Sequence, residues 1–332
     1  MKLKFLTIVL ASLGILLAFS ISQLVLNDKG KRNIDIKGTH AQENSKNYKT
    51  IGIVVHNMQH MFMANVAGIL REKAKEYDNI KVLLYDSEGS NAKQILQLRE
   101  LIDMKVDGII LNPNDKNHID RGVVDAWTAG IPVITVNMNV SSDLIHCYIG
   151  SDSVQAGEFQ GRYVAGRLNG KGNVVVIAGQ KGHDATSDRL KGLKNIFRDY
   201  PGIHIVEVQY GDWDRHRGSE IMKSILNRHI KFDAVVSHND EMMLGALSVL
   251  DSYGLKTVTI GVDAIPEALE AIKEGRMDAT VYQNSRAQAV EAFEVMMKIF
   301  KKEPVEKVKL VPYELVTSEN IDEYIAQNFI VK

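Results

Sequence analysis

From residue 50 onward, short apolar runs alternate with longer segments in which apolar residues recur every three or four positions. The apolar runs of the first half are 50–55, 80–86, 106–113 and 131–137. The segments between them are 62–77, 91–105 and 118–130. Apolar runs of this length are typical of strands buried in a parallel sheet, and the intervening spacing is that of helices packed on it. The alternation predicts a parallel α/β unit.

A connecting strand at 144–152 leads into a second unit with the same alternation. Its predicted helices are 153–170, 188–200, 215–229, 241–254 and 266–275. Its predicted strands are 173–179, 203–209, 232–240, 257–264 and 278–284. A long helix at 287–302 and a final segment, 307–321, complete the pattern. We therefore expect an α/β protein with two doubly wound parallel sheets.

The N-terminus follows a different pattern. Phe5–Leu26 contains no charged residue, and its 22 residues would span about 33 Å as a helix, enough to cross a bilayer. We expect residues 1–26 to form an apolar helix that is either a signal anchor or a cleaved signal peptide. Residues 27–49 are polar and aperiodic, which predicts a flexible tether. The protein is then exported, anchored to the outer face of the cytoplasmic membrane, or periplasmic if residues 1–26 are removed.

Composition narrows the function classes. The net charge of −1 provides no basic field for nucleic acid. The single cysteine, Cys147, lies in an apolar run and reads as a buried strand residue. No Walker loop, nucleophile elbow or paired-carboxylate arrangement is present, so we expect no enzyme and no cofactor. Asp212 and Asp214 flank Trp213, but on an extended chain their side chains would point away from its ring.

Polar and aromatic residues gather just beyond the predicted strands, where parallel sheets bind ligands. They are Asn112, Asn137, His183, Asp184, Arg189, Trp213, Asn239, Asp263 and Gln283. Amide, carboxylate and guanidinium groups can each bond two neighbouring hydroxyls, and an aromatic ring can stack on the C–H face of a sugar. Such residues can instead cap helices or turns. We expect this of Ser151 and Asp240, and Asn112 is open between the two.

The chain from about Thr50 to its end resembles the periplasmic pentose- and hexose-binding proteins of the ribose and galactose/glucose type. The segments that carry the resemblance are "GIILNP", "IPVITVN", "YIGSDSVQAGEFQG", "GDWDRHRG", "HNDEMMLGAL", "IGVDAIPEALEAIKEG" and "ATVYQN". The resemblance implies a first sugar-binding lobe of residues 50–148 plus 285–312 and a second of 149–284 plus 313–332. A three-strand hinge would join them, with crossings near 148–152, 282–285 and 312–317.

Carried over by position, the resemblance implies a galactose/glucose-type pocket. Phe62 and Trp213 resemble its two stacking rings, and His183 and Arg189 resemble the His and Arg of hexose binders. The hydroxyl-bonding positions are Asn137, Asn239, Asp263 and Gln283, with His60 where relatives have Asn or Asp. The candidate rim residues are His56, Met63, Asn112, Met138 and Asp184.

Several residues depart from the family pattern. Ala185 replaces an acid that helps to hold a hexose, and Met138 and Ser187 replace two arginines of ribose binders. The calcium loop of some galactose/glucose binders is absent. The stretch "HNMQHMFM" (56–63) has the His and Met residues of a soft-metal site, but it crosses a strand–helix junction, so helical spacing of His56 and His60 is not assured. We interpret it as the first-lobe lip of the sugar pocket, with no metal.

The resemblance implies an extracytoplasmic solute-binding protein. It would clamp a monosaccharide, an aldohexose such as galactose or glucose, and deliver it to the permease of an ABC-type transporter. The alternative is a membrane-anchored sugar sensor that signals to a histidine kinase. A metal-binding protein and a sugar-responsive repressor are less favoured, since a repressor needs a DNA-reading motif before Thr50. We expect the part after the tether to be monomeric, with contact to the membrane through the N-terminal segment.

Overall fold

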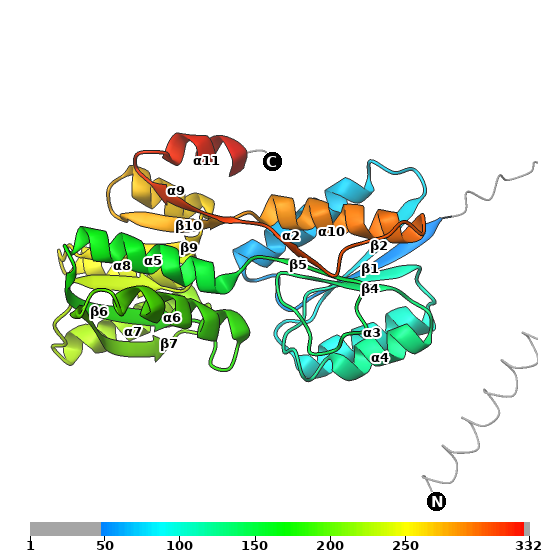
Figure 1. Ribbon diagram of the computed structural model, residues 1–332, viewed down its shortest axis with the longest axis horizontal. Helices are drawn as coiled ribbons and strands as arrows, with labels where there is room; N and C mark the ends of the chain where they lie inside the picture. The colour runs from blue at the N-terminus through cyan, green and yellow to red at the C-terminus, as the bar shows by residue number, and fades with distance from the viewer. Residues whose placement is uncertain (1–47, 329–332) are drawn as a thin grey trace, which may run out of the picture. The chain divides into compact units, whose positions relative to one another are not determined.

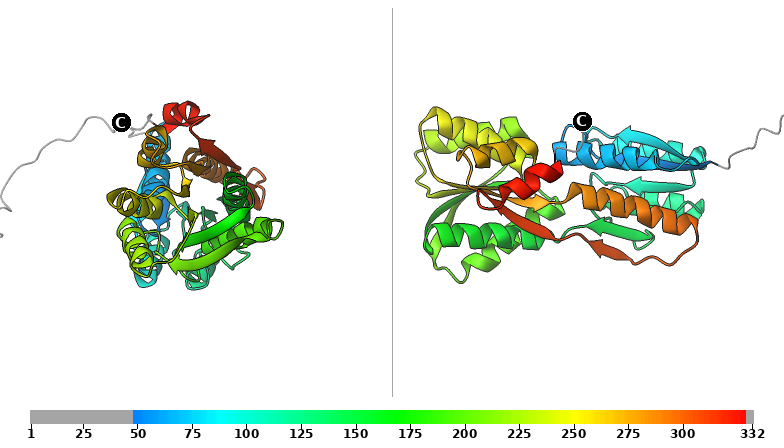
Figure 2. Two further views of the ribbon diagram at one scale, coloured as in Figure 1. Left: turned by 90° about the vertical axis from the view of Figure 1, so that its left-hand side faces the viewer. Right: turned by 90° about the horizontal axis from the view of Figure 1, so that it is seen from above.

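Two α/β lobes make up the part of the chain that the computed structural model describes, residues 48–328, which belongs to one compact unit (Figures 1 and 2). The predicted apolar segment 1–26, and the tether as far as residue 47, lie outside the described residues. Within the described range, no helix combines the length and apolar character needed to span a membrane. Each lobe is built on one six-stranded sheet.

The first lobe is built on a sheet of strand order β11-β5-β4-β3-β1-β2, in which all strand pairs are parallel. Its strands are β1 (Lys49–Val55), β2 (Ile80–Asp86), β3 (Gly108–Leu111), β4 (Val133–Val136), β5 (Cys147–Gly150) and β11 (Val308–Leu310). Its helices are α2 (Met61–Ala74), α3 (Asn91–Asp103), α4 (Asp120–Thr128) and α10 (Ser285–Phe300).

Helices cover both faces of this sheet, as its buried strands require. Helices α2 and α10 lie side by side on one face and share a core that includes Leu70 and Phe293 (Figures 1 and 2). Helices α3 and α4 cover the other face through residues such as Leu101 and Val123. Because α10 comes late in the chain, the first lobe is assembled from two distant segments.

The second lobe has the strand order β12-β10-β9-β8-β6-β7, with β12 antiparallel to β10 and the other pairs parallel. Its strands are β6 (Lys171–Ala178), β7 (Gly202–Tyr210), β8 (Ala234–Ser237), β9 (Val258–Asp263), β10 (Ala279–Gln283) and β12 (Tyr313–Thr317). Its helices are α5 (Ser153–Arg167), α6 (Asp184–Phe197), α7 (Arg215–Asn227), α8 (Asp240–Ser252), α9 (Pro266–Lys273) and α11 (Ile321–Asn328).

Glycines let two helix pairs of this lobe approach very closely. A Cβ atom on Gly157 of α5 would lie 1.9 Å from the carbonyl oxygen of Arg189 on α6, and one on Gly192 would lie 2.0 Å from that of Val154. Helices α7 and α8 meet in the same way at Gly218 and Gly245. Backbone therefore packs against backbone, which fixes the start of α6 relative to the sheet.

The chain passes between the two sheets three times. It leaves the first sheet after β5 and enters α5, returns after β10 into α10, and leaves again between β11 and β12. At the first two crossings, Gln288 of α10 donates a hydrogen bond through Nε2 to Ser151 Oγ at 3.0 Å. The crossings are therefore held together by buried side chains as well as by the chain itself.

The predicted fold class is confirmed, since both sheets are parallel apart from β12 and have helices on both faces. Two local expectations are wrong. Asp212 and Trp213 are not extended but have φ values of 49° and 67°, so the alternation argument for their side chains does not apply. The final helix, α11, was not predicted.

Candidate functional site

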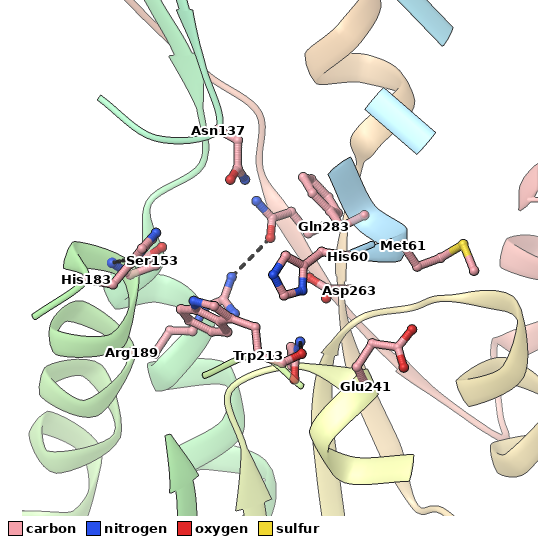
Figure 3. A pocket seen from close by; sticks show the side chains of 13 residues that line it. His60, Met61, Asn137, Ser153, His183, Arg189, Trp213, Glu241, Asp263 and Gln283 are labelled. Carbon is pink, nitrogen blue, oxygen red and sulfur yellow. Dashed lines mark hydrogen bonds between the residues drawn. The ribbon is translucent and has the colours of Figure 1, made fainter. Parts of the chain in front are cut away.

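A cavity with about 570 Å³ of empty space, part of it open to solvent, lies where loops of the two lobes meet at the carboxyl ends of their strands (Figure 3). The first lobe contributes His60, Met61, Phe62 and Asn137. The second lobe contributes Ser153, His183, Ala185, Arg189, Trp213, Asn239, Glu241, Asp263 and Gln283. All nine residues predicted from the sequence as the sugar site line this one cavity.

The first-lobe wall comes from the start of α2 and the end of β4. His60 is the N-cap of α2 and makes no capping hydrogen bond with its side chain, and Phe62 follows in the first turn. Asn137 adopts φ 66°, a left-handed conformation that asparagine tolerates. Its carbonyl oxygen accepts a bond from Tyr148 Oη at 3.2 Å. No described residue bonds its side-chain amide, so that amide is available to a ligand.

Arg189 is held rigidly on the opposite wall. Its Nη2 donates to Gln283 Oε1 at 3.0 Å and to Tyr313 Oη at 3.3 Å, and its Nη1 donates to the His238 carbonyl oxygen. Figure 3 shows the bond to Gln283 as a dashed line. The guanidinium carbon lies 5.6 Å from the centre of the Trp213 ring. These contacts fix one cation and one aromatic face in the cavity before any ligand enters.

Trp213 is positioned by its turn and by its neighbours. Asn239 caps α8 by accepting from Met242 N at 3.0 Å, and its Nδ2 donates to the Trp213 carbonyl oxygen at 3.1 Å. A Cβ atom at Gly179 would lie 2.1 Å from the ring, so glycine is what lets the ring lie against the end of β6. The His183 ring meets the indole edge-on at 5.2 Å. The indole is therefore fixed as a stacking surface.

Asp263 has both an unusual backbone and a free carboxyl group. It ends β9 with φ 120°, a conformation that side chains rarely adopt. No described residue donates a hydrogen bond to its carboxyl group. Burial raises the pKa of Asp263 from 3.8 to about 7, against a lowering effect of Arg189 and with a smaller raising effect of Glu241. A strained, partly buried acid without a donor is a group prepared for an incoming hydroxyl.

Asp240, which we expected to cap a helix or a turn, does not line the cavity and bonds the turn before α9. Its carboxylate accepts from Thr280 Oγ1 at 2.7 Å and from Ile265 N at 3.1 Å, while Asn239 caps α8. Burial and the nearby Asp263 raise its pKa. Ser151 is not a cap either, because Asp152 caps α5 and Ser151 bonds Gln288.

The histidines around the cavity are neutral near pH 7. Burial, with the Arg189 charge, lowers the pKa of His183 to about 4, and its Nδ1 accepts from Ala185 N at 3.2 Å as the cap of α6. Burial also lowers the pKa of His60 and brings that of His56 to about 4. The rings of His56 and His60 stack at 5.3 Å. Among residues 48–328 no group of three or more His, Cys, Asp or Glu side chains could hold a metal ion.

The five candidate rim residues lie outside the lining. His56 and Asn112 bond each other, with His56 Nδ1 2.5 Å from Asn112 Oδ1, and Met63 is buried in the core of the first lobe. Met138 lines a neighbouring polar cavity, and Asp184 forms an ion pair with Lys116. Met138, Met63 and Asn112 are almost fully buried, so they are structural in this arrangement.

Four lining residues were not among the predicted site residues: Met61, Ser153, Ala185 and Glu241. Met61 lies between two predicted residues, and the other three lie in the first turns of helices that follow strands. Position alone could have found them, because a first helical turn beyond a parallel strand faces the same edge. Glu241 is bonded to Arg215 Nε at 2.6 Å, so it brings a compensated charge to the cavity wall.

A sequence profile of the periplasmic binding protein domain matches residues 51–304. The chain belongs to this family, which confirms the resemblance drawn from its motifs. The ribose import binding protein RbsB of Bacillus subtilis is 31% identical over 83% of this chain and 90% of its own length. A putative rhizopine-binding protein of Rhizobium meliloti is 32% identical over 84% of this chain and 94% of its own.

A solved structure agrees with both lobes. An ABC transporter solute-binding protein from Bacillus halodurans, with bound myo-inositol, superposes with a TM-score of 0.82 at 34% identity. The match covers 86% of this chain and 99% of the other. The two-lobed fold is therefore that of a periplasmic solute-binding protein.

Proposed function

We propose that this chain is an extracytoplasmic binding protein that holds a neutral monosaccharide or cyclitol between its lobes and delivers it to an ABC-type permease. Family membership supports the extracytoplasmic role, and the ribose and myo-inositol relatives support a small polyhydroxylated ligand. No group in the cavity has the arrangement of a nucleophile with its base, so the role is binding and release.

The observation that carries this proposal is a pair of polar groups without partners facing a fixed aromatic surface. The Asn137 amide comes from the first lobe and the Asp263 carboxyl from the second, and both line the same cavity as the Trp213 ring. A ring with adjacent hydroxyls can bond both groups at once while its C–H face rests on the indole. Because the two groups belong to different lobes, such a ligand also favours closure.

The lining supports a neutral ligand rather than an acidic one. Arg189 is the one cation among the residues that line the cavity, and acceptors within the protein bond both of its terminal nitrogens, while its Nε has no partner among the described residues. Asp263 in its ionised form would repel a carboxylate or phosphate, while the charge of Glu241 is compensated by Arg215. Neutral rings rich in hydroxyls, such as galactose, glucose and myo-inositol, therefore suit the cavity.

The test is a thermal-shift screen of the full chain in a sugar-free detergent. The ligands are myo-inositol, galactose, glucose and ribose, with Cu²⁺ and Zn²⁺ as metal probes. We expect one of the polyols at about 100 times its Kd to add about 2.7 kcal/mol of stability, and no shift with either metal. The Trp213→Ala variant serves as control and should lose the response. The proposal would be contradicted if only a metal ion shifted the melting temperature, or if none of the polyols did.

A further inference from the structure

An ion pair joins the two lobes beside the cavity lined by Asn137, Trp213 and Asp263, which is called the ring cavity. Lys116 belongs to the loop between β3 and α4 of the first lobe, and Asp184 is the first residue of α6 in the second. Lys116 Nζ lies 2.9 Å from Asp184 Oδ1, with 40% and 43% of the two side chains exposed. The pair therefore crosses the cleft at its solvent-facing side.

A second cavity, with about 450 Å³ of empty space, lies next to this ion pair and is mostly polar. Both lobes line it, the first through Lys116 and Met138 among others, and the second through His183 and its neighbours. His183 also lines the ring cavity, and Asn137 there is the chain neighbour of Met138. The polar cavity is thus the part of the cleft between the ring site and the ion pair.

Both partners of the ion pair are presented by firm local structure. Asp115 Oδ1 accepts from the backbone of Asn117 at 2.8 Å and of His118 at 3.1 Å, and Ser141 Oγ donates to Asn117 Oδ1 at 2.9 Å. Lys116 therefore extends from an ordered turn. Asp184 starts α6, where the helix dipole favours a negative charge, and it follows His183, which caps the helix.

We infer that Lys116 and Asp184 are positioning residues that latch the lobes together over a bound ligand. This inference rests on the proposed function. Lys116 and Asp184 belong to different lobes, so a rotation that opens the cleft separates them. The ion pair therefore stabilises only the closed state. A contact made only when the cleft is closed slows release of the ligand more than it speeds binding.

The test compares ligand release in the full chain and in three variants: Lys116→Gln, Asp184→Asn, and the charge exchange Lys116→Asp with Asp184→Lys. Stopped-flow tryptophan fluorescence, in which Trp213 reports on the cavity, follows binding of myo-inositol, galactose, glucose and ribose. We expect each single variant to release its polyol roughly two- to five-fold faster, with little change in the association rate, since a partly exposed ion pair is weak.

The charge exchange separates attraction from any structural role of either residue. It should return the release rate to within about two-fold of the natural protein. Added salt should speed release from the natural protein and leave the single variants nearly unaffected. Asp125→Asn is the matched control, because Asp125 forms an ion pair with Arg121 at the same 2.9 Å but within one helix, and it should change nothing.

The latch would be overturned if both single variants released the ligand at the natural rate, or if the charge-exchange variant released it as fast as the single variants. The proposed function would then remain intact. If the natural protein binds none of the four polyols, the proposed function fails, and the latch fails with it. The two failures are therefore distinguishable from the same set of traces.

Discussion

At the scale of single residues, Asp263 combines a rare backbone conformation with a raised pKa. Its φ of 120° and its partly buried carboxyl both destabilise the free protein. The raised pKa makes the stability of the fold depend on pH. Because the folded value of about 7 exceeds the ordinary 3.8, protonated Asp263 stabilises the fold at acid pH, and that stabilisation is lost as pH rises through about 7.

Ligand affinity should depend on the protonation state of the Asp263 carboxyl group. Hydroxyl donors and the nearby Arg189 favour the carboxylate form, so we expect affinity for a polyol to rise up to about ten-fold per pH unit below pH 7 and to level off above it. Asp263→Asn should bind more weakly and lose this profile. Calorimetric titration with myo-inositol and galactose between about pH 5 and pH 8.5 measures both effects.

Asp240→Asn is the control, since Asp240 has a raised pKa but does not line the cavity. It should keep the profile. If the pH profile of the affinity survived Asp263→Asn and disappeared in Asp240→Asn, the titrating group would be Asp240 and not Asp263.

The residues of the site could be predicted where position at a strand end decides them. Asn137, Asp263 and Gln283 each follow or end a parallel strand, and the sheet rule brings them together without side-chain detail. The rim residues depend on details that a linear pattern does not contain. Met63 is one position beyond Phe62 on α2, and the helical rotation of that step points it into the core.

At the scale of elements, close helix packing sets the position of the cavity wall. The backbone of α5 at Gly157 lies against the carbonyl group of Arg189 on α6, so the guanidinium position depends on a glycine in another helix. A side chain at Gly157 must push α6 outward, because the atom it meets is backbone and cannot rotate away.

We expect Gly157→Ala to lower the free energy of unfolding by about 1–3 kcal/mol and to weaken polyol binding through Arg189. Gly166→Ala is a control on the same helix, where an added Cβ meets nothing within 4 Å. It should be neutral or stabilise by up to about 1 kcal/mol. Urea unfolding and calorimetry measure the two effects. Equal stabilities of the two variants would show that α5 and α6 separate easily.

Elements were predicted well where the apolar period is strong and poorly where a turn depends on rare backbone angles. The β and α segments of both lobes follow the predicted order, because buried runs and amphipathic stripes are local signals. The turn at Asp212 and Trp213 uses positive φ at two residues other than glycine, which no local preference announces. Helix α11 has eight residues, as α9 does, but it lacks the proline that marks the start of α9.

At the scale of the whole molecule, each lobe has its own apolar cores. Leu70 is fully buried in a first-lobe core with Phe293, and Leu250 is 1% exposed in a second-lobe core. No apolar core cluster of the described residues joins the two sheets. The lobes should therefore open independently in the free protein and together when a ligand bridges them.

Leu70→Ala should cost about 2–5 kcal/mol and speed hydrogen exchange in β1, α2 and α10 while leaving β8 and β9 protected. Leu250→Ala should do the reverse. Saturating polyol should reduce the difference between the lobes in both variants. Mass spectrometry of peptides from each lobe measures it. Uniform acceleration across both lobes would mean that they unfold as one unit.

Because α10 comes late in the chain, the first lobe cannot be completed until most of the second lobe has been synthesised. The chain has produced β1 to β5 by Gly150, yet the helix that covers their apolar face beside α2 starts only at Ser285. At about 5–20 residues per second, synthesis of the stretch between them takes on the order of 10 s. During that interval most of the second lobe can fold, while the first exposes the groove that awaits Phe293. In a chain that emerges N-terminus first, the first lobe thus remains incomplete while most of the second is synthesised, and its uncovered apolar face is where we expect aggregation to begin.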